Sequence, residues 1–257
     1  MSGSRVTFVG DAMAAVVAGV IEVRLHIGQP PVIVGGLAVL SRLSIPYRAT
    51  TDLDVVDRMR SGLRQLELLR AASDAKAIEP AAVELVTPYG PVKVDVLEVR
   101  QVEIDHPSDD PGDRLHASAH AWANDTATDL TMEVILPGGE NIEVTTPVAE
   151  PGPLVAMKLQ AIMNRSLDKQ GTDLLDIIRL TLDPATRPVA LDQIRGVDEQ
   201  VRRDIAQHVA LWFDRKQDQA FTWVQRAGGH DIVLDDLSLV GELLTDAAKG
   251  PSGRPHA

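Results

Sequence analysis

Two pairs of alternating apolar segments, each joined by a short glycine-containing turn, constrain the fold of this chain most strongly. Alternation of apolar and polar residues is typical of strands that bury one face, and turns of this composition join antiparallel neighbours. The first half of the chain is therefore expected to contain two β-hairpins. They are predicted at 82–88 and 92–99 around Tyr89-Gly90-Pro91, and at 130–136 and 140–146 around Pro137-Gly138-Gly139.

Helical spacing of apolar residues alternates with short β-branched runs in the rest of the first half. A helix predicted at 11–27 ends at Gly28, and a β-branched run at 31–36 leads through two glycines into a second helix. The polar stretch 106–129 is expected to begin as a loop and to continue as a helix. The other predicted elements are helices at 37–43, 58–72 and 114–124 and a strand at 53–56.

The turn-rich segment 147–153 marks a change from mixed to almost wholly helical sequence. The pattern predicts an α+β fold, in which a mixed β-sheet with flanking helices spans residues 1–147 and a helical domain spans residues 148–249. Residues 250–257 are polar and are expected to form a disordered tail. Helices of the second domain are predicted at 153–166, 170–182, 198–213, 214–226 and 235–248.

Composition narrows the chemistry that is open to the chain. The absence of cysteine from its 257 residues excludes disulfides, thiolate metal sites and cysteine nucleophiles. The sequence contains no run of about 18 apolar residues, so we expect a cytoplasmic protein without a membrane span. The net charge of −12 argues against broad affinity for nucleic acid, which requires Lys and Arg to neutralise phosphates.

Carboxylates occur where packing alone would not select them. Asp52 and Asp54 are two residues apart in a predicted strand and so share a face, and Asp95 lies within another alternating strand. Each could be a turn cap or a solvated strand end if taken alone. Together they call for a compensating cation, and Mg²⁺ prefers such oxygen ligands. Upstream, Gly35-Gly36 precedes a helix N-terminus, where backbone N–H groups can hold a phosphate.

A glycine turn, a carboxylate pair and a third carboxylate on a later strand together resemble the DNA polymerase beta superfamily of nucleotidyltransferases. The resemblance implies that an NTP is the substrate and that two Mg²⁺ ions, with Mn²⁺ as an alternative, bridge its phosphates. Asp52, Asp54 and Asp95 would then be metal ligands and catalytic residues. Asp95 would also help to deprotonate the attacking hydroxyl.

The stretch 154–180 contains Lys158, Arg165, Asp173 and Asp176. It resembles the signature helix pair of the AbiEii-type nucleotidyltransferase toxins, relatives of the MenT toxins, in which Lys and Arg precede Asp-x-x-Asp. Lys158 and Arg165 are expected to share a helix face and to balance the charge of the triphosphate. The resemblance implies catalytic roles for Lys158 and Asp176 and nucleotide-binding roles for Lys158, Arg165 and Asp173. The two aspartates could instead cap their helix, form ion pairs with the two cations, or orient them.

The front half matches the same family through Gly35-Gly36 and the Arg-x-Thr-x-Asp-Leu-Asp pattern that begins at Arg48. The resemblance implies that Arg48 and Thr50 bind the nucleotide together with the two glycines, although a loop threonine is also a common cap. It further implies that the helical domain completes the active-site cleft.

By this resemblance the protein would be a toxin that transfers a nucleoside monophosphate to the 3′ end of tRNA and is restrained by a cognate antitoxin protein. The acceptor could instead be a small molecule such as an aminoglycoside, or a protein hydroxyl. A third possibility is a catalytically inactive binding module. The carboxylate triad favours an enzyme, because a binding module has no need of three anions that face one another.

Other patterns are less specific. His116 and His120 have the i, i+4 spacing of a helical metal site but lack an evident third ligand. Trp212, Phe213 and Trp223 could stack on bases, although aromatic residues in a helical domain more often fill the core. The basic pairs Arg202-Arg203 and Arg215-Lys216 could contact an RNA backbone but are expected on solvated helix faces.

Overall fold

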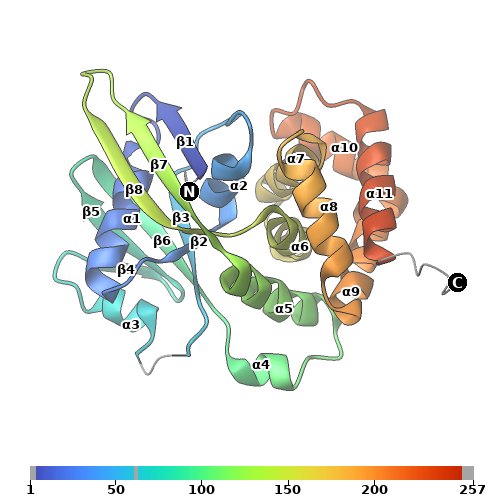
Figure 1. Ribbon diagram of the computed structural model, residues 1–257, viewed down its shortest axis with the longest axis horizontal. Helices are drawn as coiled ribbons and strands as arrows, with labels where there is room; N and C mark the ends of the chain where they lie inside the picture. Colours follow the sequence, from blue (N-terminus) through green and yellow to red (C-terminus); the bar gives the residue numbers. More distant parts are fainter. Residues whose placement is uncertain (1–3, 61–62, 251–257) are drawn as a thin grey trace, which may run out of the picture. The chain divides into compact units, whose positions relative to one another are not determined.

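The computed structural model shows two compact units (Figure 1). Within the described residues, every helix is too short or too polar to cross a membrane. The predicted tail lies outside the described residues from residue 251 onward. The structure describes residues 4–60 and 63–250; unit 1 comprises residues 1–106 and 120–150, and unit 2 comprises residues 107–119 and 151–257.

Unit 1 contains a mixed sheet to which the described residues contribute eight strands, in the order β1-β7-β8-β2-β3-β6-β5-β4. The pairs β1/β7, β8/β2 and β3/β6 are parallel, and the other pairs are antiparallel. Both predicted hairpins are confirmed, as β5/β6 and β7/β8. The strands are β1 (Ser4–Val9), β2 (Val32–Val34), β3 (Asp52–Asp57), β4 (Lys76–Glu79), β5 (Ala82–Thr87), β6 (Gly90–Glu98), β7 (Thr128–Ile135) and β8 (Asn141–Val148).

Helix α1 (Ala14–Ile27) packs on the apolar face of this sheet, against β3, β5, β6, β7 and β8. Gly19 permits a close approach, since a Cβ there would lie 2.8 Å from Val92 and 3.5 Å from Leu53. As predicted, the helix ends at Gly28, which has a left-handed φ of 75°. Because side chains alternate along a strand, Asp52 and Asp54 of β3 and Asp95 of β6 point to the opposite face.

The segment after β3 departs from the helix predicted at 58–72, because α3 covers only Gln65–Arg70. The buried carboxylate of Asp57 accepts hydrogen bonds from the backbone N–H groups of Met59 and Gln65, each at 2.8 Å. Met59 also has a φ of 49°, which no helix accommodates. A side chain that competes for backbone donors favours a turn, so the leucine spacing predicted too long a helix.

Unit 2 is helical, and α7 packs against α6, α8, α10 and α11. Trp212 and Trp223 are buried with Phe213, and the two indole centroids are 5.7 Å apart, so these aromatic residues fill the core. The expected α+β class, a mixed sheet followed by helices, is confirmed. Helices α4 and α8 were not expected from the pattern. The remaining helices are α2 (Gly35–Arg42), α4 (Gln101–Asp105), α5 (Pro111–Thr126), α6 (Pro151–Ala161), α7 (Leu167–Leu182), α8 (Thr186–Gly196), α9 (Glu199–Ala210), α10 (Gln217–Arg226) and α11 (Leu234–Ala248).

Candidate active site

The glycine pair and the paired aspartates meet where β2 passes into α2. Val34, the last residue of β2, pairs with Asp54 on β3, and Gly35 begins α2 with a φ of 65°. A Cβ at Gly35 would lie 1.9 Å from Oδ2 of Asp54. The Asp54 carboxylate therefore lies against the first turn of α2, at a position that requires glycine both for its φ and for its lack of a side chain.

Arg48 and Thr50 lie beside the second glycine. A Cβ at Gly36 would be 3.0 Å from Oγ1 of Thr50 and 3.2 Å from Nη2 of Arg48. Arg48 donates from Nε to the hydroxyl of Tyr47 at 3.2 Å, and its guanidinium carbon lies 5.7 Å from the centroid of that ring. Within unit 1, the two parts of the predicted front motif are thus brought together at the N-terminus of one helix.

The other end of α2 is held by Arg42. Its guanidinium donates to the carbonyl oxygen of Ala149 at 3.0 Å and to the hydroxyl of Thr128 at 2.9 Å, and it lies 3.1 Å from the carboxylate of Glu150. Burial lowers the pKa of Arg42, and Glu150 opposes this shift. Because these partners lie at the ends of β7 and β8, the arginine fixes α2, and with it Gly35, on the sheet.

Asp95 lies directly across from Asp54. Strands β3 and β6 are parallel, and their register pairs Asp52 with Lys93 and Asp54 with Asp95. Residues paired across neighbouring strands point to the same face, so the three aspartates share the face that points away from α1. Lys93 lies on this face too, with Nζ 3.3 Å from Oδ1 of Asp95 and 2.9 Å from Oε1 of Glu79.

The charged groups on this face shift one another's pKa values. Burial raises the pKa of Asp95; Lys93 lowers it, and the charge of Asp52 raises it further. Burial lowers the pKa of Lys93, but its contacts with Glu79 and Asp95 outweigh burial and leave that pKa raised. Lys93 is therefore a cation at neutral pH, and the face carries an excess of negative charge that favours a further cation.

The ligands on this face fit Mg²⁺ when water or a nucleotide supplies the further oxygens. Among the described residues, no group of three or more His, Asp or Glu side chains is close enough to hold a metal ion by itself. Mg²⁺ commonly takes one or two carboxylates and completes its coordination with water and phosphate oxygens, which Asp52 and Asp54 can satisfy. The Lys93 ammonium beside Asp95 shows that this face accommodates a cation.

Gly35→Ala is expected to destabilise unit 1 by about 1–3 kcal/mol, because the added Cβ meets Asp54 and alanine disfavours a positive φ. Gly138→Ala is a matched control, since a Cβ at Gly138 meets nothing within 4 Å. Urea unfolding of the two variants measures the difference. A Gly35→Ala protein as stable as the wild type would show that Asp54 does not lie against this turn.

In unit 2, Lys158 on α6 forms a buried ion cluster with two aspartates of α7. Its Nζ lies 2.5 Å from Oδ1 of Asp173 and 2.8 Å from Oδ2 of Asp176, and the three side chains are 8%, 3% and 0% exposed. Burial lowers the pKa of Lys158, but the two carboxylates outweigh burial and leave it raised. Nε of Arg165 lies 3.3 Å from Oδ2 of Asp173, so two cations balance two anions.

The four residues of the second predicted motif therefore meet, but two details of the predicted geometry are wrong. Arg165 does not share a helix with Lys158, because α6 ends before it, a 3₁₀ turn follows, and Arg165 itself is extended. Asp173 and Asp176 lie in the interior of α7, not in its first turn, so they do not cap it. Among the roles considered, ion pairing with Lys158 and Arg165 is the one observed.

The histidines spaced i, i+4 lie on α5 without the surroundings of a metal site. Nδ1 of His116 lies 3.3 Å from Oε1 of Gln160, and His120 is buried. Within the described ranges, no third His, Asp or Glu joins them in a metal-binding group. These contacts indicate packing roles.

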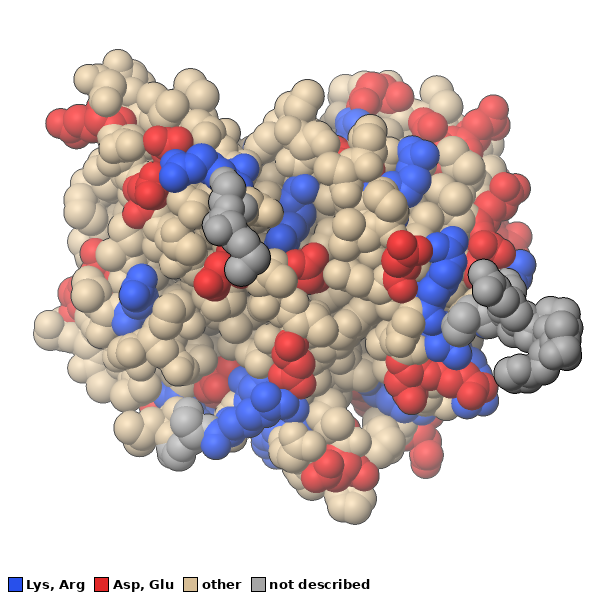
Figure 2. All heavy atoms as spheres, in the orientation of Figure 1, with Lys and Arg blue, Asp and Glu red and all other residues tan. Residues whose placement is uncertain are grey.

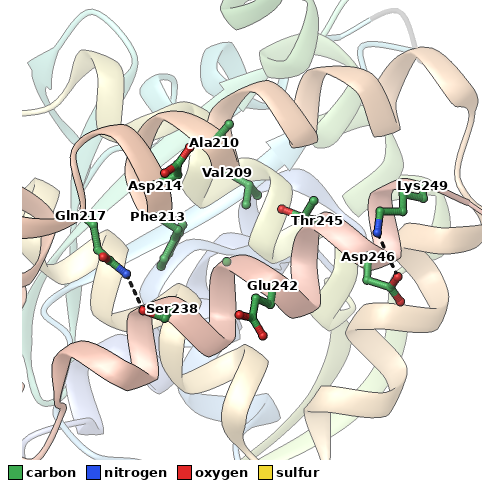
Figure 3. A pocket seen from close by; sticks show the side chains of 11 residues that line it. Val209, Ala210, Phe213, Asp214, Gln217, Ser238, Glu242, Thr245, Asp246 and Lys249 are labelled. Carbon is green, nitrogen blue, oxygen red and sulfur yellow. Dashed lines mark hydrogen bonds and ion pairs between the residues drawn. The ribbon is translucent and has the colours of Figure 1, made fainter.

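An open groove of about 690 Å³ in unit 2 lies between α11 and the short π-helix Leu211–Arg215 that follows α9 (Figure 3). Gly241 lets α11 approach Phe213, since a Cβ there would be 3.0 Å from the phenylalanine Cβ. Asp214 and Glu242 are among its lining residues, whereas none of the predicted site residues is. The groove is therefore separate from both residue groups described above.

No protein-family model matches the chain, and no curated protein matches its sequence. Among solved structures, this chain is similar to one described as the crystal structure of an antigenic nucleotidyltransferase-like protein from Paracoccidioides brasiliensis. The identity is 20%, the TM-score is 0.42, and the match covers 84% of this chain and 94% of the other. A likeness at this level assigns neither a family nor an activity.

Proposed function

We propose that the chain is a metal-dependent nucleotidyltransferase, which moves a nucleoside monophosphate from an NTP to an acceptor hydroxyl and releases pyrophosphate. The observation that carries this proposal is the contact of Asp54 with Gly35 at the start of α2, with Asp95 in register beside it. It combines a helix N-terminus suited to phosphate with three carboxylates on one face of a sheet. Three like charges close together repel one another and destabilise the fold, and a binding module would gain nothing from them.

Each group has a distinct task in the proposed reaction. The backbone N–H groups at the start of α2 hold a phosphate, and Arg48 and Thr50 beside Gly36 add a cation and a hydroxyl. Asp52, Asp54 and Asp95 would hold Mg²⁺ or Mn²⁺ together with oxygens of water and the nucleotide, and the metal would supply positive charge to the triphosphate. Asp95 is the proposed acceptor of the proton from the attacking hydroxyl.

Lys158, Arg165, Asp173 and Asp176 are proposed to take part in the same reaction, on the pattern of the AbiEii-type toxins. Lys158 would balance the charge that develops on the triphosphate. Asp173 and Asp176 support this role because they keep the buried ammonium charged and fix its position.

The acceptor that we propose is the 3′ end of tRNA, and the proposed role is that of a cytoplasmic toxin restrained by an antitoxin protein. Both proposals follow from the resemblance to the AbiEii-type toxins. On the face drawn in Figure 2, Lys and Arg side chains are interspersed with Asp and Glu. Recognition of an RNA end would therefore depend on a few local groups and not on a broad basic field.

The acceptor can be identified by incubating the purified protein with Mg²⁺, each α-labelled NTP in turn, and total tRNA. We expect label on tRNA with the wild type and none with Asp52→Ala. Label only on the protein itself, or on an added aminoglycoside, would replace tRNA by that acceptor. The absence of label with every NTP and acceptor would favour the binding module.

A further inference from the structure

The carboxylate face of unit 1 contains a cation that belongs to the chain, Lys93. The sheet register aligns it with Asp52 on β3 and with Glu84 on β5, so its stem rises from a row of acidic side chains. Its ammonium contacts Asp95 at 3.3 Å and Glu79 at 2.9 Å. The side chain is only 23% exposed, so the ammonium is held between these carboxylates instead of extending into water.

The two carboxylates that share this lysine differ in their surroundings. Asp95 lies in the interior of the sheet, opposite Asp54, and its side chain is 22% exposed. Glu79 ends β4, an edge strand, and is 57% exposed. A flexible lysine stem that reaches both groups can leave Asp95 and still keep a partner in Glu79.

We propose that Lys93 is the resident counter-ion of the metal site, which pairs with Asp95 in the metal-free protein and moves wholly onto Glu79 when a divalent cation binds. This inference rests on the proposed function, because it takes Asp95 to be a metal ligand. Lys93 is then a positioning residue that sets the affinity for metal, and Glu79 keeps the displaced ammonium paired.

Charge repulsion over a few ångströms explains how Lys93 and Glu79 would each change the affinity for metal. A divalent cation on Asp95 and an ammonium beside the same carboxylate repel each other, so Lys93 opposes metal binding until it moves away. Removal of the lysine charge should therefore tighten metal binding. Removal of the Glu79 charge leaves Lys93 with Asp95 as its partner, which should weaken metal binding.

The test is a titration of the nucleotide-free, full-length protein with Mn²⁺, in which free Mn²⁺ is followed by electron paramagnetic resonance. Lys93→Met is expected to lower the Kd about fivefold, and Glu79→Gln to raise it about twofold or more, with both effects shrinking at high salt. Lys76→Met is the matched control, because the register of β4 and β5 places Lys76 next to Glu84, at the far end of the same row. Its Kd should equal that of the wild type.

Asp54→Asn separates the inference from the function on which it rests. If the wild type binds Mn²⁺ and Asp54→Asn does not, the metal site is supported. An unchanged or raised Kd in Lys93→Met would then overturn the inference about Lys93 alone. An equal tightening in Lys76→Met also overturns it, because the effect would then be one of net charge. If neither the wild type nor Lys93→Met binds Mn²⁺, both the inference and the metal site fail.

Discussion

Asp54→Asn is expected to reduce nucleotide transfer by about 1,000-fold or more, because several kcal/mol of transition-state stabilisation depend on the metal that this carboxylate would hold. Folding should be preserved. The substitution keeps the shape of a side chain that lies against Gly35 and removes one of three like charges on the same face. The free energy of unfolding is therefore expected to equal or exceed that of the wild type.

Asp129→Asn provides the control for this prediction, since Asp129 is an exposed residue of β7 in the same sheet. It should retain full transfer activity and full stability. The rate of label transfer and the urea unfolding curve of all three proteins show whether Asp54 serves transfer or stability. An Asp54→Asn protein that is less stable and fully active would give Asp54 a structural role and remove it from the proposed site.

Lys158→Met is expected to destabilise the protein by about 3–5 kcal/mol, because it leaves two buried carboxylates without their cation. Arg165 reaches Asp173 but is itself 35% exposed, so it compensates in part. Lys169→Met removes an exposed lysine of α7 and should change stability by less than about 0.5 kcal/mol. Urea unfolding at neutral pH measures both variants.

A triple variant separates the structural role of Lys158 from the proposed catalytic one. Lys158→Met combined with Asp173→Asn and Asp176→Asn removes the buried charges together, and most of the lost stability should return. Transfer activity should remain absent if the cluster takes part in the reaction. A stable triple variant with wild-type activity would limit the cluster to holding α6 against α7.

Local signals made much of the sheet and the first helix predictable. The turns at 89–91 and 137–139 join the strands that they were expected to join, and Gly28 ends α1. Alternation also determined the face of Asp52 and Asp54, because a strand with one buried face leaves no choice of side for its polar residues. The same alternation put Lys93 beside Asp95, although it indicated no role for the lysine.

Features that depend on contacts between distant residues were not predictable. Strand β1 pairs with β7, which lies more than a hundred residues away in the sequence, and no local pattern predicts such a partner. The four residues of β4 are all exposed, so this strand has no apolar face to reveal it. Glu79 consequently had no evident link to Lys93.

The cluster in unit 2 illustrates the same limit. Lys158 was expected to share a helix face with Arg165 and to point into the cleft, but it is buried because Asp173 and Asp176 approach it from the neighbouring helix. Helical spacing shows which residues share a face, whereas it does not show which face another helix covers. The extended conformation of Arg165 likewise follows from the end of α6, which the apolar spacing did not mark.

Labelling of the NTP at defined phosphates tests the central claim most directly. With Mg²⁺ and the acceptor pool, α-phosphate label should appear on the acceptor and γ-phosphate label in released pyrophosphate, and both should vanish in Asp54→Asn. Transfer of the γ-phosphate label to the acceptor would indicate a phosphotransferase. Transfer of the α-phosphate label at the wild-type rate by Asp54→Asn would contradict the assignment of the site.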